Sequence, residues 1–298
     1  MTVLDDMRAT AGKHLRDGKY NEAIMAYRAI LEVVKGDFGA THGMAQAAIH
    51  LGKHAEASQL LFGALAAQPE NAEAWLHYGM AQQHLGKPDR AIESYTRALS
   101  FKPDFADALF CMAVTQKDDG RFKAALESLD RFIALRGDVP NALLMRGDLL
   151  RQSGDVAGAL ADYESALSIA PNFLEGWMHR GALLAETGRG DEALASYDRA
   201  QALAPNSGDV WYNRGVALQD MRRDTEALEA YDRAVKLAPN FPDGWNNRGT
   251  VLRNAGRTEE ALASFSRALK LNPDHPQALR NKAEAEVALS PGPDDIKH

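Results

Sequence analysis

The chain has 298 residues, of which 45% are hydrophobic and 25% charged, a composition typical of a folded globular protein. Its net charge of −7 argues against sequence-independent nucleic-acid binding, which requires clustered lysines and arginines. The single cysteine, Cys111, excludes an internal disulfide or a cysteine metal cluster, and no apolar run is long enough to predict a membrane span.

The first residues, MTVLDDMRAT, lack the basic and apolar runs of a signal peptide, so a cytoplasmic location is expected. From residue 4 onward the sequence divides into eight units of 34 residues without insertion or deletion. These units are 4–37, 38–71, 72–105, 106–139, 140–173, 174–207, 208–241 and 242–275. Such a fixed period indicates a repeat architecture.

Four positions of the unit are restricted in size or type. Position twenty is alanine in all eight units, and position eight is always glycine or alanine. Position twenty-four is always large, and six units have proline at position thirty-two. The small residues predict a close approach of two helices, and substitution of Gly215 by leucine should overpack that crossing.

Each unit predicts two antiparallel helices. Apolar residues recur at helical spacing on both sides of a turn glycine such as Gly256, and the later proline cannot continue the second helix. Residues 276–289 predict one further helix with a polar face, as expected of a helix that caps an open end. Residues 290–298 have no periodicity and are expected to be disordered.

The tryptophan, glycine, tyrosine, alanine and proline at these positions resemble the signature of tetratricopeptide repeats. Units three and five to eight match closely, units one, two and four lack tryptophan at position four, and unit seven has Arg222 in place of the turn glycine. The resemblance implies an all-α fold. Residues 1–289 would form a right-handed α-solenoid (superhelix) that consists of eight tandem helix-turn-helix units and the capping helix 276–289. It also implies a concave groove, lined by positions two, five, six, nine, twelve and thirteen, that holds a partner peptide or helix.

The groove positions of this sequence carry an apolar ribbon and a set of polar residues. The apolar residues are Leu76, Met80, Phe110, Val114, Leu144, Met178, Ala182, Tyr212 and Val216. The polar residues are His77, His179, Asn213, Asn246, Asn247 and Asn254. An exposed ribbon would mark a partner site, whereas the alternative is that these side chains pack against neighbouring helices. Asparagine amides can bind a peptide backbone without reading its sequence.

Charged residues also recur by position. Acids at position two are favoured by the helix dipole whatever the protein does. Arginine stands at position seven of units five to eight, and units five to seven have an acid at position twenty-five. This spacing predicts an ion pair inside each unit, such as Arg214 with Asp232.

The sequence has no phosphate-binding loop, nucleophile elbow or metal-ligand spacing, and the repeat leaves no insertion in which to build a pocket. We therefore expect no catalysis, no cofactor and no metal, the last although His42, His50, His77 and His84 fall on groove positions. The expected function is a protein-interaction scaffold that binds a protein or peptide segment. Two alternatives are the substrate-recruiting arm of an O-linked glycosyltransferase system, whose Trp-x-Asn-Arg-Gly units these resemble, and a scaffold that self-associates.

Overall fold

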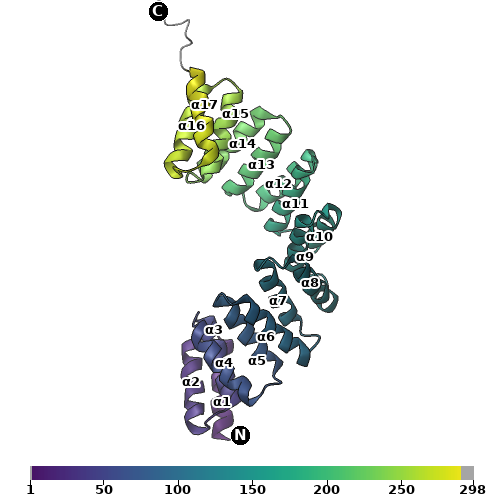
Figure 1. Ribbon diagram of the computed structural model, residues 1–298, viewed down its shortest axis with the longest axis vertical. Coiled ribbons are helices and arrows are strands. Elements are labelled where there is room, and N and C mark those ends of the chain that lie inside the picture. The colour runs from purple at the N-terminus through teal and green to yellow at the C-terminus, as the bar shows by residue number, and fades with distance from the viewer. Residues whose placement is uncertain (1, 290–298) are drawn as a thin grey trace, which may run out of the picture. The chain divides into compact units, whose positions relative to one another are not determined.

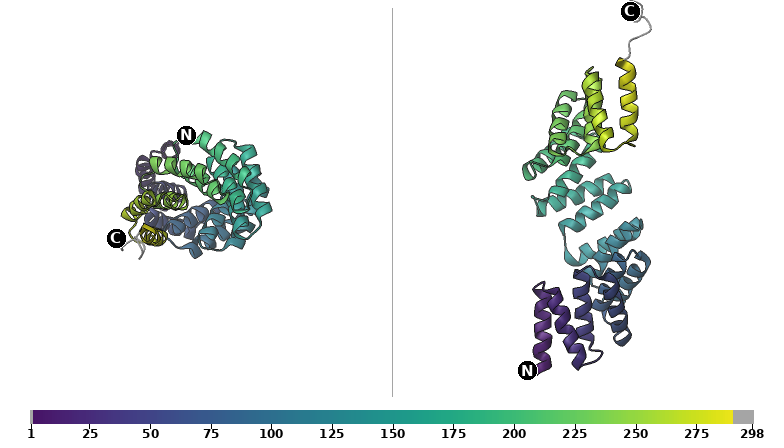
Figure 2. Two further views of the ribbon diagram at one scale, coloured as in Figure 1. Left: turned by 90° about the horizontal axis from the view of Figure 1, so that it is seen from above. Right: turned by 90° about the vertical axis from the view of Figure 1, so that its left-hand side faces the viewer.

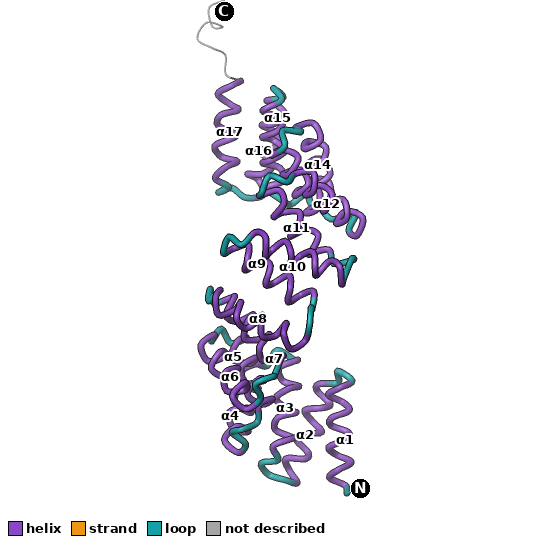
Figure 3. The backbone as a smooth tube through the Cα atoms, turned by 90° about the vertical axis from the view of Figure 1, so that its right-hand side faces the viewer, coloured by secondary structure: helices purple, strands orange, loops and turns teal. Residues whose placement is uncertain are grey.

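The computed structural model describes residues 2–289, and this part of the chain consists of α-helices joined by short turns, with no strand (Figures 1 and 3). None of the described helices is both long and apolar enough to cross a bilayer. The predicted tail, residues 290–298, lies outside the described residues. The all-α repeat fold predicted from the sequence is confirmed.

The helices form two compact units, residues 1–142 and residues 143–298, and the boundary falls inside α9. We call these the first unit and the second unit, whereas units one to eight remain the 34-residue repeats. The prediction of one continuous array over residues 1–289 therefore stays a prediction. The first unit contains α1 (Val3–Arg16), α2 (Tyr20–Val33), α3 (Phe38–His50), α4 (His54–Ala67), α5 (Ala72–His84), α6 (Pro88–Phe101), α7 (Ala106–Asp118) and α8 (Phe122–Arg136). The second contains most of α9 (Pro140–Gln152), then α10 (Val156–Ile169), α11 (Leu174–Glu186), α12 (Gly190–Leu203), α13 (Gly208–Asp220), α14 (Asp224–Leu237), α15 (Pro242–Asn254), α16 (Thr258–Leu271) and α17 (Pro276–Leu289).

The helices follow the 34-residue period closely. From α3 to α15 every odd-numbered helix begins at the first residue of a unit, and we call these the first helices and their even-numbered partners the second helices. Arg222 does not disturb this pattern, because its φ of 59° is close to that of the glycines it replaces. Unit four differs at its end, where Gly137 stands in place of proline and α8 is 15 residues long instead of 14.

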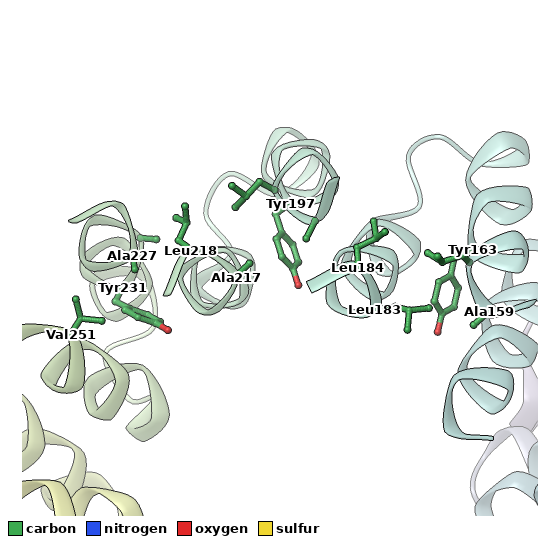
Figure 4. Packing of buried hydrophobic residues seen from close by; sticks show 14 residues of the cluster. Ala159, Tyr163, Leu183, Leu184, Tyr197, Ala217, Leu218, Ala227, Tyr231 and Val251 are labelled. Carbon is green, nitrogen blue, oxygen red and sulfur yellow. The ribbon is translucent and has the colours of Figure 1, made fainter. Parts of the chain in front are cut away.

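In units three and five to eight, the glycine at position eight packs against the aromatic ring at position twenty-four. A Cβ added to Gly215 would lie 2.7 Å from Cε1 of Tyr231, and one added to Gly249 would lie 2.5 Å from Cε1 of Phe265. Figure 4 shows the equivalent tyrosines Tyr163, Tyr197 and Tyr231 in successive hairpins of the second unit. Glycine is needed at these crossings because even a methyl group would overlap the ring.

Units two and four achieve the same packing with different residues. They have alanine at position eight and leucine at position twenty-four, Ala45 with Leu61 and Ala113 with Leu129. All four side chains are fully buried. The extra methyl group of alanine is therefore matched by a smaller partner, and the total volume at the crossing is kept.

In the four repeats that have tryptophan at position four, this residue joins the repeat to the preceding one. Nε1 of Trp75 donates a hydrogen bond to the carbonyl oxygen of Pro69 at 2.7 Å. Trp177 and Trp245 donate in the same way to Pro171 and Pro239. The proline that ends one unit and the tryptophan of the next thus fix the turn between units.

Three of the arginines at position seven also join successive repeats, which corrects the pairing expected from the sequence, whereas Arg146 bonds to Asp162 of its own repeat at 2.6 Å. Arg248 lies 2.6 Å from Asp232 of the preceding repeat. The next pairs toward the N-terminus are Arg214 with Asp198 and Arg180 with Glu164. The predicted pair of Arg214 with Asp232 inside one unit is wrong, because each acid faces the first helix that follows it.

The predicted capping helix is present as α17, which packs beside α15 and α16 (yellow in Figure 2, right). Ala278 and Ala285 are buried against this hairpin. Elsewhere on α17, Leu279 and Val287 are 49% and 74% exposed. α17 therefore closes the apolar end of the last hairpin and presents a new, mixed surface.

Candidate functional site

The first helices place the predicted site residues on a shared surface. Side chains at positions five, six, nine, twelve and thirteen of one first helix contact those of the next, as when Asn247 Nδ2 donates to the Tyr212 hydroxyl at 3.1 Å. Similar contacts join α3 to α5 and α9 to α11. We call the surface formed by these positions, together with position two at the start of each first helix, the first-helix face and describe it separately for the two units.

In residues 1–142 the apolar ribbon is partly used by the core. Leu76 is 6% exposed and therefore belongs to the packing. Met80, Phe110 and Val114 are half-buried. The ring of Phe110 lies against Phe132 of α8 at 5.2 Å between centroids.

In residues 143–298 the ribbon is half-buried along its length. Leu144, Met178, Tyr212 and Val216 pack against the buried cluster that contains the core tyrosines, and none of the four is fully covered. Tyr212 also meets Phe241 edge-on at 4.7 Å. Each side chain thus has one side fixed by the core and the other open, which gives a preformed apolar surface.

The asparagines near the C-terminal end are largely engaged. Asn246 is only 5% exposed, and its Oδ1 accepts a hydrogen bond from Asn281 Nδ2 of α17 at 2.9 Å. Its own Nδ2 donates to Asn247 Oδ1 at 3.2 Å. Asn246 is therefore a structural link to α17, contrary to the expectation that it faces a groove. Asn213 is half-buried and Asn254 is exposed, and neither amide makes a hydrogen bond within residues 2–289.

The histidines of units two and three form pairs between helices. His77 Nδ1 lies 2.7 Å from the carbonyl oxygen of Glu73 and 3.0 Å from Nε2 of His42. An N–H at His77 Nδ1 donates to both, so His42 Nε2 is an acceptor in a neutral ring. Burial and the neighbouring His77 lower the pKa of His42 to about 4. Burial also lowers the pKa of His77.

These rings are packed rather than arranged around a common point. His54 stacks on His84 with 4.2 Å between ring centroids, and His50 stacks on Tyr20. Within residues 2–289 no three His, Cys, Asp or Glu side chains are placed to hold a metal ion. Cys111, also on this face, has its thiol pKa raised to about 11 by burial, which keeps the thiol protonated and weakly nucleophilic at neutral pH.

Asp148 is a member of the first-helix face that the sequence reasoning missed. It stands at position nine, where neighbouring units have Val114 and Ala182. Its Oδ1 lies 2.6 Å from His179 Nδ1 and accepts from the Tyr163 hydroxyl at 2.8 Å. His179 is thereby oriented by an acid of the preceding first helix. The signal in the sequence was the break that Asp148 makes in the apolar residues at position nine of units three to seven.

Comparisons with known proteins agree on the repeat. Family models described as tetratricopeptide repeat match residues 14–82, 72–105, 112–172, 208–241 and 242–275. No curated protein sequence matches the chain.

Solved structures of the same repeat are similar in fold. A tetratricopeptide repeat protein from Parabacteroides merdae is 18% identical over 84% of this chain and 98% of that one, with a TM-score of 0.64. The C-terminal part of a TPR repeat-containing protein from Cytophaga hutchinsonii is 16% identical over 92% of this chain and 98% of that one, with a TM-score of 0.60. YrrB, described as a TPR protein with an unusual peptide-binding site, is 22% identical over 61% of this chain and 94% of that one, with a TM-score of 0.54. Identities at this level establish a shared fold alone.

Proposed function

Because the chain belongs to the tetratricopeptide-repeat family, we propose that it is a non-catalytic scaffold whose first-helix face holds a segment of a partner protein. The observation that carries the proposal is the half-buried apolar row of Met178, Tyr212 and Val216. An ordered apolar surface that is left partly open marks a contact site in soluble proteins. The peptide-binding site of YrrB, a chain of the same fold, supports this choice.

The test compares two double variants of the full chain in affinity capture. Met178→Gln with Val216→Gln makes the first-helix face polar without adding charge. Ile169→Gln with Leu203→Gln is the matched control, because these residues are 47% and 38% exposed on second helices. We expect partners to be lost only with the first pair, at unchanged helix content. Retention of every partner by the Met178 and Val216 variant would refute the proposal.

The glycosyltransferase alternative has weaker support. A row of asparagines along the first-helix face would be needed to hold a substrate chain, and the amides of Asn246 and Asn247 are already bonded inside the repeat array. Asn213 and Asn254 remain, too few to form a row.

Self-association is a second candidate function, favoured by the exposed Leu279 and Val287 of α17. Two such surfaces could pack against each other and remove both residues from water. Light scattering across a range of concentrations tests this directly. A dimer mass that falls to the monomer mass in Leu279→Glu with Val287→Glu supports self-association, whereas a monomer at all concentrations excludes it.

A further inference from the structure

Two neighbouring first helices have the same charge pattern, an acid at each end and an uncharged middle on the first-helix face. In α11 the acids are Glu175 and Glu186, and in α13 they are Asp209 and Asp220. The apolar row that supports the proposed function lies between them. This face of the second unit therefore has two acidic rows, one along each edge.

The helix dipole explains only one of these rows. Glu175 and Asp209 are in the first turn of their helices, where the dipole stabilises an acid. Glu186 and Asp220 are the last residues of theirs, where the dipole opposes negative charge. Because local helix energetics disfavour the second row, its presence points to a role outside the helix.

Three of the four carboxylates make no ion pair in the part of the chain that the structure describes. Glu186 pairs with Arg151, with its Oε2 at 2.9 Å from the arginine Nε. Glu175, Asp209 and Asp220 are exposed, and none of them makes an ion pair within the described residues. Their negative charge is available to a partner.

The second helices of the same unit pair only part of their acids. Arg189 holds Glu192 through two hydrogen bonds of 2.7 Å, and Arg223 holds Glu226 in the same way. Each of these arginines stands at the N-cap of its helix. Glu229 and Glu259 of the second helices, by contrast, are exposed and make no ion pair within the described residues. The unpaired acids of the first helices differ from them in standing at positions two and thirteen, on either side of the apolar positions five and nine.

We infer that the occupant of this face, given the proposed function, is a basic amphipathic helix of a partner protein. Positions two and thirteen are eleven residues apart, so the acidic rows are separated by about 16 Å along the helix, enough for a second helix of about 10–12 Å diameter. An apolar stripe would lie on Met178, Tyr212 and Val216. Lysines or arginines on both sides of the stripe would reach the two acidic rows, which side chains of a single extended strand could not do.

The inference is tested with synthetic peptides and the full chain in a binding titration. The probe is a helix-forming peptide with a leucine stripe flanked by lysines. One comparison peptide has each lysine replaced by glutamate, and another has the same composition with the leucines scrambled. We expect only the striped lysine peptide to bind tightly. Equal binding of the scrambled peptide, or no binding of the striped one, would overturn the inference.

Substitutions of acidic residues then show which carboxylates bind the striped lysine peptide. Asp209→Asn with Asp220→Asn should weaken binding of the striped lysine peptide at least tenfold. Asp209→Glu with Asp220→Glu should retain it within about threefold. Glu229→Gln with Glu259→Gln removes two exposed acids of second helices and should change the affinity less than twofold. Equal losses for the two neutralised pairs would show that net charge alone attracts the peptide and would overturn the inference.

Failure of this inference is distinguishable from failure of the proposed function. If partners captured from cells are lost in the Met178 and Val216 variant but retained in Asp209→Asn with Asp220→Asn, the face binds a partner that is not basic. If both variants retain every partner, the face is not the binding surface.

Discussion

Arg222 occupies a backbone conformation that suits glycine better. Its φ is 59°, whereas Gly188 and Gly256 at the equivalent turn position have φ values of 75° and 76°. A side chain in this region costs about 1–2 kcal/mol, part of which is offset because glycine loses more entropy on folding. We expect Arg222→Gly to raise the free energy of unfolding by about 1 kcal/mol in urea denaturation.

The converse change, Gly188→Arg, is the control and should lower the free energy of unfolding by a similar amount. Arg222 is exposed, so few contacts are lost when its side chain is removed. A lower stability of Arg222→Gly would show that those contacts outweigh the backbone strain.

The buried His42 makes the first unit sensitive to pH. Its pKa is lowered from 6.5 to about 4 in the folded chain. Between these two pH values the unfolded chain binds a proton at His42, whereas the folded chain does not. Stability is therefore complete above pH 6.5 and is lost as the pH falls toward 4, by about 1.4 kcal/mol per pH unit at most. We expect hydrogen-exchange protection of α3 and α5 to fall between pH 6.5 and 5.

A His42→Asn variant should show a shallower decrease over the same range, because it removes the group that takes up the proton. Helices α13 and α15 of the second unit serve as the internal control. A decrease of equal size in those helices would assign the effect to other groups.

At the scale of the element, the helical hairpin depends on the match between positions eight and twenty-four. Gly215→Ala places a methyl group 2.7 Å from Cε1 of Tyr231 and should lower the free energy of unfolding by about 1–3 kcal/mol. Tyr231→Leu in the same chain should recover part of the lost stability, since the repeat 38–71 has the equivalent pair Ala45 with Leu61. Thermal unfolding of the four variants in the cycle measures this coupling. Purely additive losses would mean that the two side chains do not compete for space.

The ion pairs between repeats have a defined direction. Arg248→Met and Asp232→Asn should couple by about 0.5 kcal/mol in a double-mutant cycle, a small value because Asp232 is half exposed. Arg214→Met and Asp232→Asn should show no coupling. Coupling of Arg214→Met with Asp232→Asn, without coupling of Arg248→Met with Asp232→Asn, would instead support an ion pair inside one 34-residue unit.

The helices and turns could be predicted from the sequence because the period repeats the same local signals eight times. The partner of Arg214 could not, because Asp198 lies 16 residues before it and Asp232 lies 18 residues after it. A repeat pattern alone does not distinguish these two neighbours. Three-dimensional stacking decides, by placing each first helix against the second helix that precedes it.

The candidate site was predicted less completely than the fold. Position five is half-buried in Tyr212 but buried in Asn246, because Asn281 of α17 covers the latter. The difference arises because only the last repeat is covered by α17. A sequence pattern that treats all repeats alike cannot predict it. The acids at position thirteen, Glu186 and Asp220, had no assigned role until their place at the C-terminal ends of helices was known.

At the scale of the whole molecule, the net charge is −7, and unpaired acids of the second unit contribute to it. The second helices of this unit hold some acids with arginines, as Arg223 holds Glu226, and leave others such as Glu229 without an ion pair among the described residues. Its first helices leave Asp209 and Asp220 unpaired on either side of the apolar row, so charge and apolar surface coincide on the first-helix face. That coincidence is the basis for assigning partner binding to this face.

Site-specific photo-crosslinking tests this assignment most directly. A photoreactive amino acid replaces Val216 on the first-helix face or Leu203 on a second helix, and the full chain is irradiated with its captured partner. We predict that the partner forms adducts from position 216 and none from position 203. Adducts from position 203 alone would contradict the account and place the binding surface on the second helices.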